Sequence, residues 1–329
     1  MKKAIGFCMG AALLVAAPVA RAQEPPAAKQ AEAEKAPGKR LHVRFQETRQ
    51  RGESATPARP SVLVLHADGK PARVFLGTQV TLTTSDKTAP ATLFKNAGVE
   101  AEVTATTLAD GRYRLDVKFE EGGVLTGDEG APPGDNPILR IVRGKSRLVL
   151  REGETVPFVS AVDPVTGEVV HVDVTVSAAP LPKAAAGAGS EGARLRAQVL
   201  LTRRQGERTV ARRPYAIVLQ ASGEEAADVF SGSELPVQLA VQGQPTVMLK
   251  DVGAGLRITA RRATDGRYRL DLSFSDGTIS MGPRSPAVRA FECESQLFLQ
   301  EGETVTIASA VDPRTGEVVE AELTLEGVR

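Results

Sequence analysis

The chain has no tryptophan, three histidines and two cysteines, and these low numbers limit the disulfides, metal sites and catalytic groups that it can form. Cys8 falls in an N-terminal leader, which leaves Cys293 alone, so neither an intramolecular disulfide nor a thiolate metal cluster is available. All three histidines (His42, His66 and His171) lie within residues 41–178, and none has a counterpart in the rest of the chain. The sequence has no G-x-S-x-G elbow, no H-E-x-x-H motif and no nucleotide-binding loop. We therefore expect no catalytic residue, cofactor or metal, and predict that the protein is not an enzyme.

The N-terminus has the pattern of a secretory signal peptide. Lys2 and Lys3 precede an apolar stretch from 4 to 15, and Ala20-Arg21-Ala22 is a small-residue cleavage site. The apolar stretch is shorter than the roughly 20 residues of a membrane-spanning helix, so we expect cleavage and no transmembrane helix afterwards. Cleavage changes the formal charge from +1 to −2 (+1 minus two Lys and one Arg), which predicts no general attraction to nucleic acid. The predicted location is the periplasm, with outer-membrane association as an alternative.

The rest of the chain is a duplication. Ser160–Val170 (SAVDPVTGEVV) recurs as Ser309–Val319 (SAVDPRTGEVV), with one difference. Asp110–Asp116 (DGRYRLD) recurs unchanged as Asp265–Asp271. Repetition in fixed order indicates that the two halves share one structure.

These observations divide the chain into five predicted parts. Residues 1–22 are the signal peptide, 23–40 a disordered tether, 41–178 the first domain, 179–194 a flexible linker and 195–329 the second domain. The tether and the linker are rich in Ala, Pro and Gly and have almost no large apolar residues. Each copy is long enough for its own hydrophobic core, so two separately folded domains are expected.

Apolar residues alternate with polar ones in each copy, which predicts antiparallel β-structure. Asp110-Gly111 and Asp265-Gly266 are two-residue hairpin signals between such stretches. Ser61–Leu65 and Tyr215–Leu219 follow Arg-Pro pairs and are predicted to be short buried strands. Gly77, which Gly232 matches in the second copy, predicts a kink or a bulge. We expect an all-β fold with two tandem domains.

Two features leave alternatives open. Cys293 lies in an alternating stretch and is either a small strand residue or the site of an intermolecular disulfide. Arg203, Arg204 and Arg208 belong to an arginine-rich region at the start of the second copy. They are either a solvated strand face or an anion-binding stripe for an envelope glycolipid or an acidic partner, since Arg suits such groups.

The order of these blocks resembles the C-terminal homology region of bacterial secretins, the outer-membrane channels of secretion systems. Similar segments are the A-x-x-x-x-G-x-x-V pattern at 72–80, Val252–Ile258 (VGAGLRI) and the EGETV turns at 152–156 and 301–305. The chain departs from that family after each EGETV turn, where SAVDP leads into another strand pair. The resemblance implies antiparallel secretin-like domains and an envelope location.

The predicted function is that of a non-enzymatic structural or binding protein of the cell envelope. Its partner would be another protein or a second copy, joined through strand edges. The alternative is a divergent outer-membrane secretion-channel component that forms an oligomeric ring.

Overall fold

The computed structural model describes residues 38–83, 92–125, 138–163, 167–179, 193–222, 225–241, 244–281 and 286–328. The prediction of an all-β fold is confirmed, because every regular element in these ranges is a strand. The predicted signal peptide, most of the tether (23–40) and most of the linker (179–194) lie outside the described residues.

Each copy supplies a matching series of eight described strands, and copy 1 adds the two-residue β2. Those of copy 1 are β1 (Arg40–Arg51), β2 (Ser54–Ala55), β3 (Arg59–His66), β4 (Ala72–Thr83), β5 (Thr92–Thr107), β6 (Tyr113–Leu125), β7 (Ile138–Leu150), β8 (Thr155–Val162) and β9 (Val169–Ala179). Those of copy 2 are β10 (Arg194–Gln205), β11 (Arg208–Gln220), β12 (Ala227–Val241), β13 (Gln244–Arg262), β14 (Tyr268–Met281), β15 (Pro286–Leu299), β16 (Thr304–Val311) and β17 (Glu317–Gly327).

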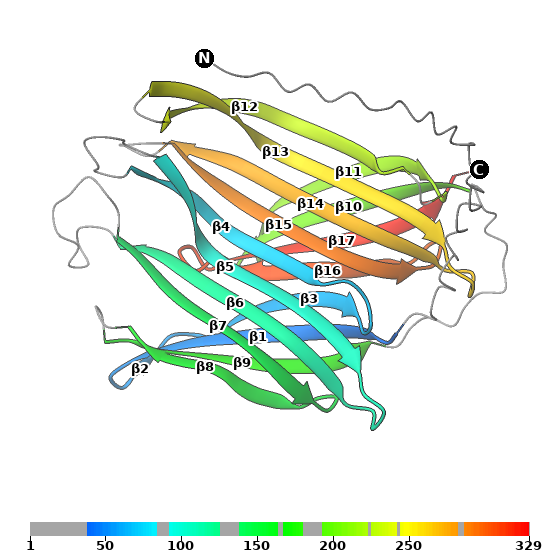
Figure 1. Cartoon of the computed structure of the whole chain (residues 1–329), viewed down its shortest axis with the longest axis horizontal. Helices are drawn as coiled ribbons and strands as arrows, with labels where there is room; N and C mark the ends of the chain where they lie inside the picture. The colour runs from blue at the N-terminus through cyan, green and yellow to red at the C-terminus, as the bar shows by residue number, and fades with distance from the viewer. Residues whose placement is uncertain are drawn as a thin grey trace, which may run out of the picture. The chain divides into compact units, whose positions relative to one another are not determined.

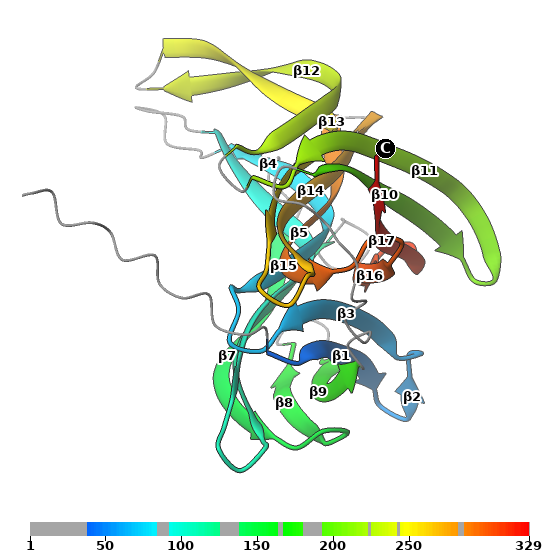
Figure 2. The ribbon, with the colours of Figure 1, turned by 90° about the vertical axis from the view of Figure 1, so that its right-hand side faces the viewer.

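The strands form two antiparallel sheets, to which both copies contribute (Figure 1). Sheet A has the order β11-β10-β17-β16-β3-β1-β9-β8, with β2 paired to β1. Sheet B has the order β12-β13-β14-β15-β4-β5-β6-β7. Figure 2 shows the two sheets as separate layers, with sheet B on the left. Every neighbouring pair is antiparallel, as hairpin connections allow.

The alternating residues form the core between the sheets. Phe45 of β1 stacks on Phe119 of β6 with ring centroids 5.6 Å apart, so the two layers meet directly. One continuous hydrophobic cluster includes residues from both copies and both sheets. The hairpins predicted at Asp110-Gly111 and Asp265-Gly266 are present, and both glycines adopt positive φ angles of 80° and 83°. Burial of this apolar surface is the main source of stability.

Gly77 does not produce the predicted bulge. It pairs with Gly98 of β5 without a register shift between β4 and β5. A Cβ atom at Gly77 would lie 2.3 Å from the carbonyl oxygen of Ala97, closer than atoms can approach. Glycine is required here because the backbone of the paired strand β5 lies too close to leave room for a side chain. Gly232 and Gly253 repeat this arrangement in copy 2.

The two copies share both sheets, which differs from the two separate units that the sequence predicts. Copy 2 joins copy 1 through β15 and β4 in sheet B and through β16 and β3 in sheet A. Cys293 lies in this junction on β15, opposite Val74, and is 2% exposed. Burial, followed by the nearby Glu294 and Glu292, raises the pKa of the Cys293 thiol. The structure therefore places this thiol out of reach of another chain, contrary to the disulfide alternative.

Candidate functional site

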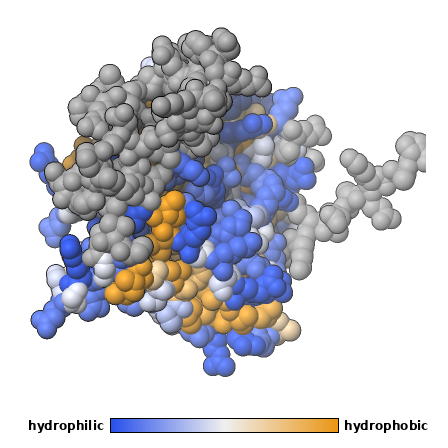
Figure 3. Space-filling model, turned by 60° about the vertical axis from the view of Figure 1, so that its left-hand side comes forward, coloured by the Kyte–Doolittle hydropathy of each residue, from blue (hydrophilic) through white to orange (hydrophobic). Residues whose placement is uncertain are grey.

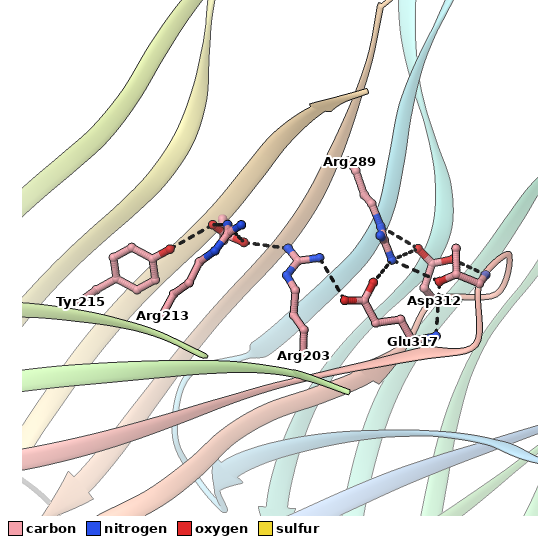
Figure 4. Close-up of polar contacts among 8 residues, drawn as sticks. Arg203, Arg213, Tyr215, Arg289, Asp312 and Glu317 are labelled. Carbon is pink, nitrogen blue, oxygen red and sulfur yellow. Dashed lines mark hydrogen bonds and ion pairs between the residues drawn. The ribbon is translucent and has the colours of Figure 1, made fainter. Parts of the chain in front are cut away.

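A cluster of buried charges joins the two sheets in copy 2 (Figure 4). Arg203 of β10 donates to Asp276 of β14 at 2.7 Å and lies 3.8 Å from Glu317 of β17. Arg213 and the Tyr215 hydroxyl of β11 also reach Asp276, at 3.2 and 3.1 Å. Because β10 and β17 belong to sheet A and β14 to sheet B, these contacts fix one sheet on the other.

The repeated SAVDPxTGEVV segment supplies the other half of this cluster. Asp312 accepts hydrogen bonds from the backbone N–H groups of Arg314 and Thr315, at 2.8 and 3.1 Å, and so shapes the turn between β16 and β17. The same carboxylate pairs with Arg289 of β15 at 2.7 Å, and Arg289 also contacts Glu317. The repeated turn therefore places two carboxylates, those of Asp312 and Glu317, against an arginine of the opposite sheet.

Copy 1 has the same five-residue cluster at equivalent positions. Arg49 of β1 contacts Glu121 of β6 and lies 3.2 Å from Glu168. Arg140 of β7 lies 3.1 Å from Asp163 and 3.3 Å from Glu168. Duplication of all five charged residues indicates that the cluster belongs to the basic architecture of each copy.

Copy 1 adds one carboxylate that copy 2 lacks. Glu47 accepts a hydrogen bond from Arg49 at 2.7 Å and lies 3.8 Å from Arg59, whereas copy 2 has Leu201 at this position. Burial, together with the negative charge of Glu47, raises the pKa of Glu121 to about 7, although Arg49 opposes the change. Glu121 therefore takes up a proton near neutral pH.

Neither cluster has the arrangement of an active site. Arg49, Glu47, Arg203 and Asp276 are buried, and their charges are directed at one another. Among the described residues, no group of three or more His, Cys, Asp or Glu side chains could hold a metal ion. The clusters connect the two sheets through buried ion pairs.

The three arginines of the predicted anion stripe do not lie together on the surface. Arg203 is 6% exposed and belongs to the buried cluster. Arg204 pairs with Glu320, and Arg208 is exposed at the start of β11. The sequence showed the arginines but not their orientation. The repeat did indicate a structural role for Arg203, because the equivalent position in copy 1 is also an arginine, Arg49.

The junction between the copies combines backbone pairing with specific side-chain contacts. The Ser295 hydroxyl of β15 donates to the carbonyl oxygen of Val64 on β3 at 2.8 Å. Arg40 donates to the carbonyl oxygen of Phe298 at 2.9 Å and pairs with Glu303 at 2.7 Å. The junction therefore combines strand pairing with specific side-chain contacts between the two copies.

His66 is a further part of the junction. Its Nδ1 lies 3.0 Å from the Gly38 carbonyl oxygen, and its Nε2 accepts a hydrogen bond from the Phe298 backbone N–H at 3.3 Å. Its ring also meets the Phe298 ring edge-on at 5.0 Å. Burial lowers the pKa of His66 to about 4, with Arg40 and Arg267 acting in the same direction and the Gly38 hydrogen bond opposing them. The neutral ring, which can donate at Nδ1 and accept at Nε2, fits both partners.

In the described residues, the two sheet orders end at β11 and β12 of copy 2 and at β7 and β8 of copy 1. We call β3/β4 and β11/β12 the leading edges, and β7/β8 and β15/β16 the trailing edges. The internal junction pairs the leading edge of copy 1 with the trailing edge of copy 2. The open leading and trailing edges are therefore the repeat equivalents of the two surfaces that already pair.

Residues buried in the junction have exposed equivalents on the open edges. On the leading edges, Val64 and Val74 are fully buried, whereas their equivalents Val218 and Val229 are 55% and 39% exposed. On the trailing edges, Phe298 and Val311 are 5% and 6% exposed, whereas their equivalents Val149 and Val162 are 41% and 64% exposed. In the described part of the chain, all but one of the exposed large hydrophobic residues lie on the four open edge strands. Figure 3 shows orange hydrophobic side chains gathered in a strip on one face of the molecule. Exposed apolar residues on sheet edges are typical of an interaction site.

No family model and no curated protein matches this chain. Among solved structures, it is similar to the Salmonella SPI-1 type III secretion injectisome secretin InvG, with a TM-score of 0.31, 8% identity and coverage of 88% of this chain and 65% of that one. It is also similar to the type II secretion system secretin GspD of E. coli K12, with a TM-score of 0.30, 11% identity and coverage of 89% and 50%. For the V. cholerae type IV competence pilus secretin PilQ, the TM-score is 0.27, the identity 13% and the coverage 90% and 63%. The chain thus spans 50–65% of the length of these three chains.

In the ranges that the structure describes, no helix has the length and apolar composition of a membrane span.

Proposed function

We propose that this chain is a non-enzymatic structural protein of the cell envelope, which builds a larger β assembly by strand addition at its open edges. The observation that carries this proposal is the exposure on β7, β8, β11 and β12 of residues whose repeat equivalents are buried in the internal junction. An open sheet edge offers unpaired backbone N–H and C=O groups, and apolar side chains beside it add a hydrophobic gain when a strand pairs there. The envelope location rests on the predicted signal peptide.

The architecture also favours one geometry of assembly. The internal junction is head-to-tail, because the trailing edge of one copy meets the leading edge of the other. A head-to-tail contact repeated between chains gives a closed ring if the rotation returns to its start, and an open fibre if it does not. A ring of this kind is the second candidate function, that of an oligomeric component of an outer-membrane secretion channel.

Sizing the purified chain by light scattering over a concentration series, with and without detergent, tests the proposal. We expect assemblies larger than one chain in the absence of detergent, which dissociate on dilution. A single mass of one chain at every concentration would reject the proposal. Fractionation of the envelope separates the two candidates, since a channel component requires a large ring in the outer-membrane fraction that detergent extracts intact.

A further inference from the structure

The sheet B side of the internal junction carries opposite charges on its two edges. On the copy 1 side, Arg73 lies on the leading strand β4 and Lys70 lies just before it. On the copy 2 side, Glu294 of β15 is directly opposite Arg73 in the register, and Glu292 is two residues away on the same strand. Lys70 also pairs with Asp271 of copy 2 at 3.1 Å. A positive leading edge thus meets a negative trailing edge.

The open edges carry the same pattern with every sign reversed. By the matching strand registers, Asp228 occupies the position of Arg73 in copy 2, and Glu225 lies two residues before β12 as Lys70 lies two residues before β4. The positions of Glu292 and Glu294 are occupied in copy 1 by Arg143 and Lys145. All four residues on the open edges are exposed. In sheet B, the open leading strand β12 is therefore negative at these positions and the open trailing strand β7 is positive.

A reversal on both edges preserves attraction between them. If the open edges pair in the register of the internal junction, Lys145 of one chain lies opposite Asp228 of the next, where Glu294 lies opposite Arg73 inside the chain. The two mismatched combinations are repulsive. Strand β7 against β4 would bring Lys145 to Arg73, and β15 against β12 would bring Glu294 to Asp228.

We propose that the open edges bind a second copy of this chain in the register of the internal junction, and that the reversed charges make copies 1 and 2 alternate along the assembly. This inference rests on the proposed function and names the partner. The backbone and the apolar residues of the two junctions are nearly the same, so without the charges a neighbouring chain would compete for the internal junction. Repulsion at the mismatched pairings prevents this exchange, which is a common device for selecting one partner among similar ones.

Two charge-reversal variants test the inference, and each takes the charges that the other copy has at those positions. The trailing variant is Arg143→Glu/Lys145→Glu, and the leading variant is Glu225→Lys/Asp228→Arg. Each variant alone has two edges of the same sign, whereas a mixture of the two offers complementary edges at every contact. Because all four side chains are exposed, folding should be retained, and circular dichroism with thermal melting checks it. Arg44→Glu/Arg51→Glu, which makes the same change of charge at two exposed residues of β1, an inner strand of sheet A, is the matched control.

We expect the wild type and the control to assemble, each reversal variant alone to associate at least about tenfold more weakly, and the equimolar mixture to regain association. Added salt should weaken wild-type assembly and strengthen that of the single variants, since it screens attraction and repulsion alike. Single variants that assemble as well as the wild type, or a folded mixture that stays dispersed, would overturn the charge order while leaving the proposed function in place. A wild type that remains a single chain would overturn both.

Discussion

Val64 and Val218 occupy the same position in the two copies, but Val64 is fully buried and Val218 is 55% exposed. Both lie on the strand that follows an Arg-Pro pair, in RPSVLVLHA and RPYAIVLQA. Val64 is covered because Ser295 and its neighbours on β15 pack beside β3. Val218 lies on β11, at the end of sheet A. The difference between these two valines is therefore a difference in neighbours and not in sequence.

Replacement of these valines should have unequal effects on stability. Val64→Ala removes buried methyl groups and should lower the free energy of unfolding by about 1–3 kcal/mol. Val218→Ala should change it by less than about 0.5 kcal/mol, because the side chain already faces solvent. Urea unfolding of dilute, dispersed protein measures both. Equal losses for the two variants would contradict the burial difference on which the open edge depends.

The ion cluster predicts a large cost for a single arginine. Arg203→Ala removes the arginine that Asp276 and Glu317 share, although Arg213, Tyr215 and Arg289 still contact these carboxylates, and should destabilise the chain by about 1.5–3 kcal/mol. Arg208→Ala is the matched control, since Arg208 is exposed, and should be nearly neutral. If Arg203→Ala kept full stability but lost binding to anionic glycolipid vesicles, the arginine stripe predicted from the sequence would be the better interpretation.

Local patterns were sufficient to predict the strands and the hairpins. Alternation around Asp110-Gly111 and the repeat at Asp265-Gly266 define buried faces and tight turns, and these depend only on near neighbours in the chain. The duplicated Asp312 turn was also predictable, because Asp and Gly fix its backbone. The role of its carboxylate was not, since Arg289 comes from another sheet.

The sharing of both sheets could not be predicted from either copy alone. Whether β3 is covered depends on β16 and β15, which are distant in the sequence. Because the two copies have similar sequences, their local patterns predict the same burial. Tyr215–Leu219 was therefore predicted to be as buried as Ser61–Leu65. The alternation of charge between Arg73 and Asp228 was visible in the sequence, but its meaning required the register of β4 and β15.

Glu121 makes stability depend on pH in the neutral range. Its pKa rises from 4.5 to about 7 on folding, mainly through burial and then through Glu47. The folded state therefore binds more protons than the unfolded state between these values, and the contribution of Glu121 falls as pH rises from about 4.5 through 7. We expect Glu121→Gln to remove this contribution, so that the free energy of unfolding of the variant relative to the wild type rises by about 2–3 kcal/mol between pH 5 and 8, as measured by urea unfolding.

Glu47→Leu is the informative companion variant, because leucine is the residue at the equivalent position in copy 2. It removes the carboxylate that opposes ionisation of Glu121, and one oxygen of Glu47 is buried without a hydrogen-bond partner. The decrease in stability with pH should become smaller in this variant. A slope that is unchanged in both Glu121→Gln and Glu47→Leu would show that another group titrates.

His66 contributes a pH dependence of the opposite sign at the junction. Folding lowers its pKa from 6.5 to about 4, so the unfolded state binds more protons in this window and stability rises with pH across it. Glutamine, the residue at the equivalent position (Gln220), has a donor and an acceptor for Gly38 and Phe298 but does not titrate.

Because the pH ranges over which His66 and Glu121 change stability overlap between about 4.5 and 6.5, their opposite slopes largely cancel in the wild type. His66→Gln should therefore expose a stability that falls with pH, and Glu121→Gln one that rises, in urea titrations over this range. Slopes of the same sign in the two variants would refute this assignment.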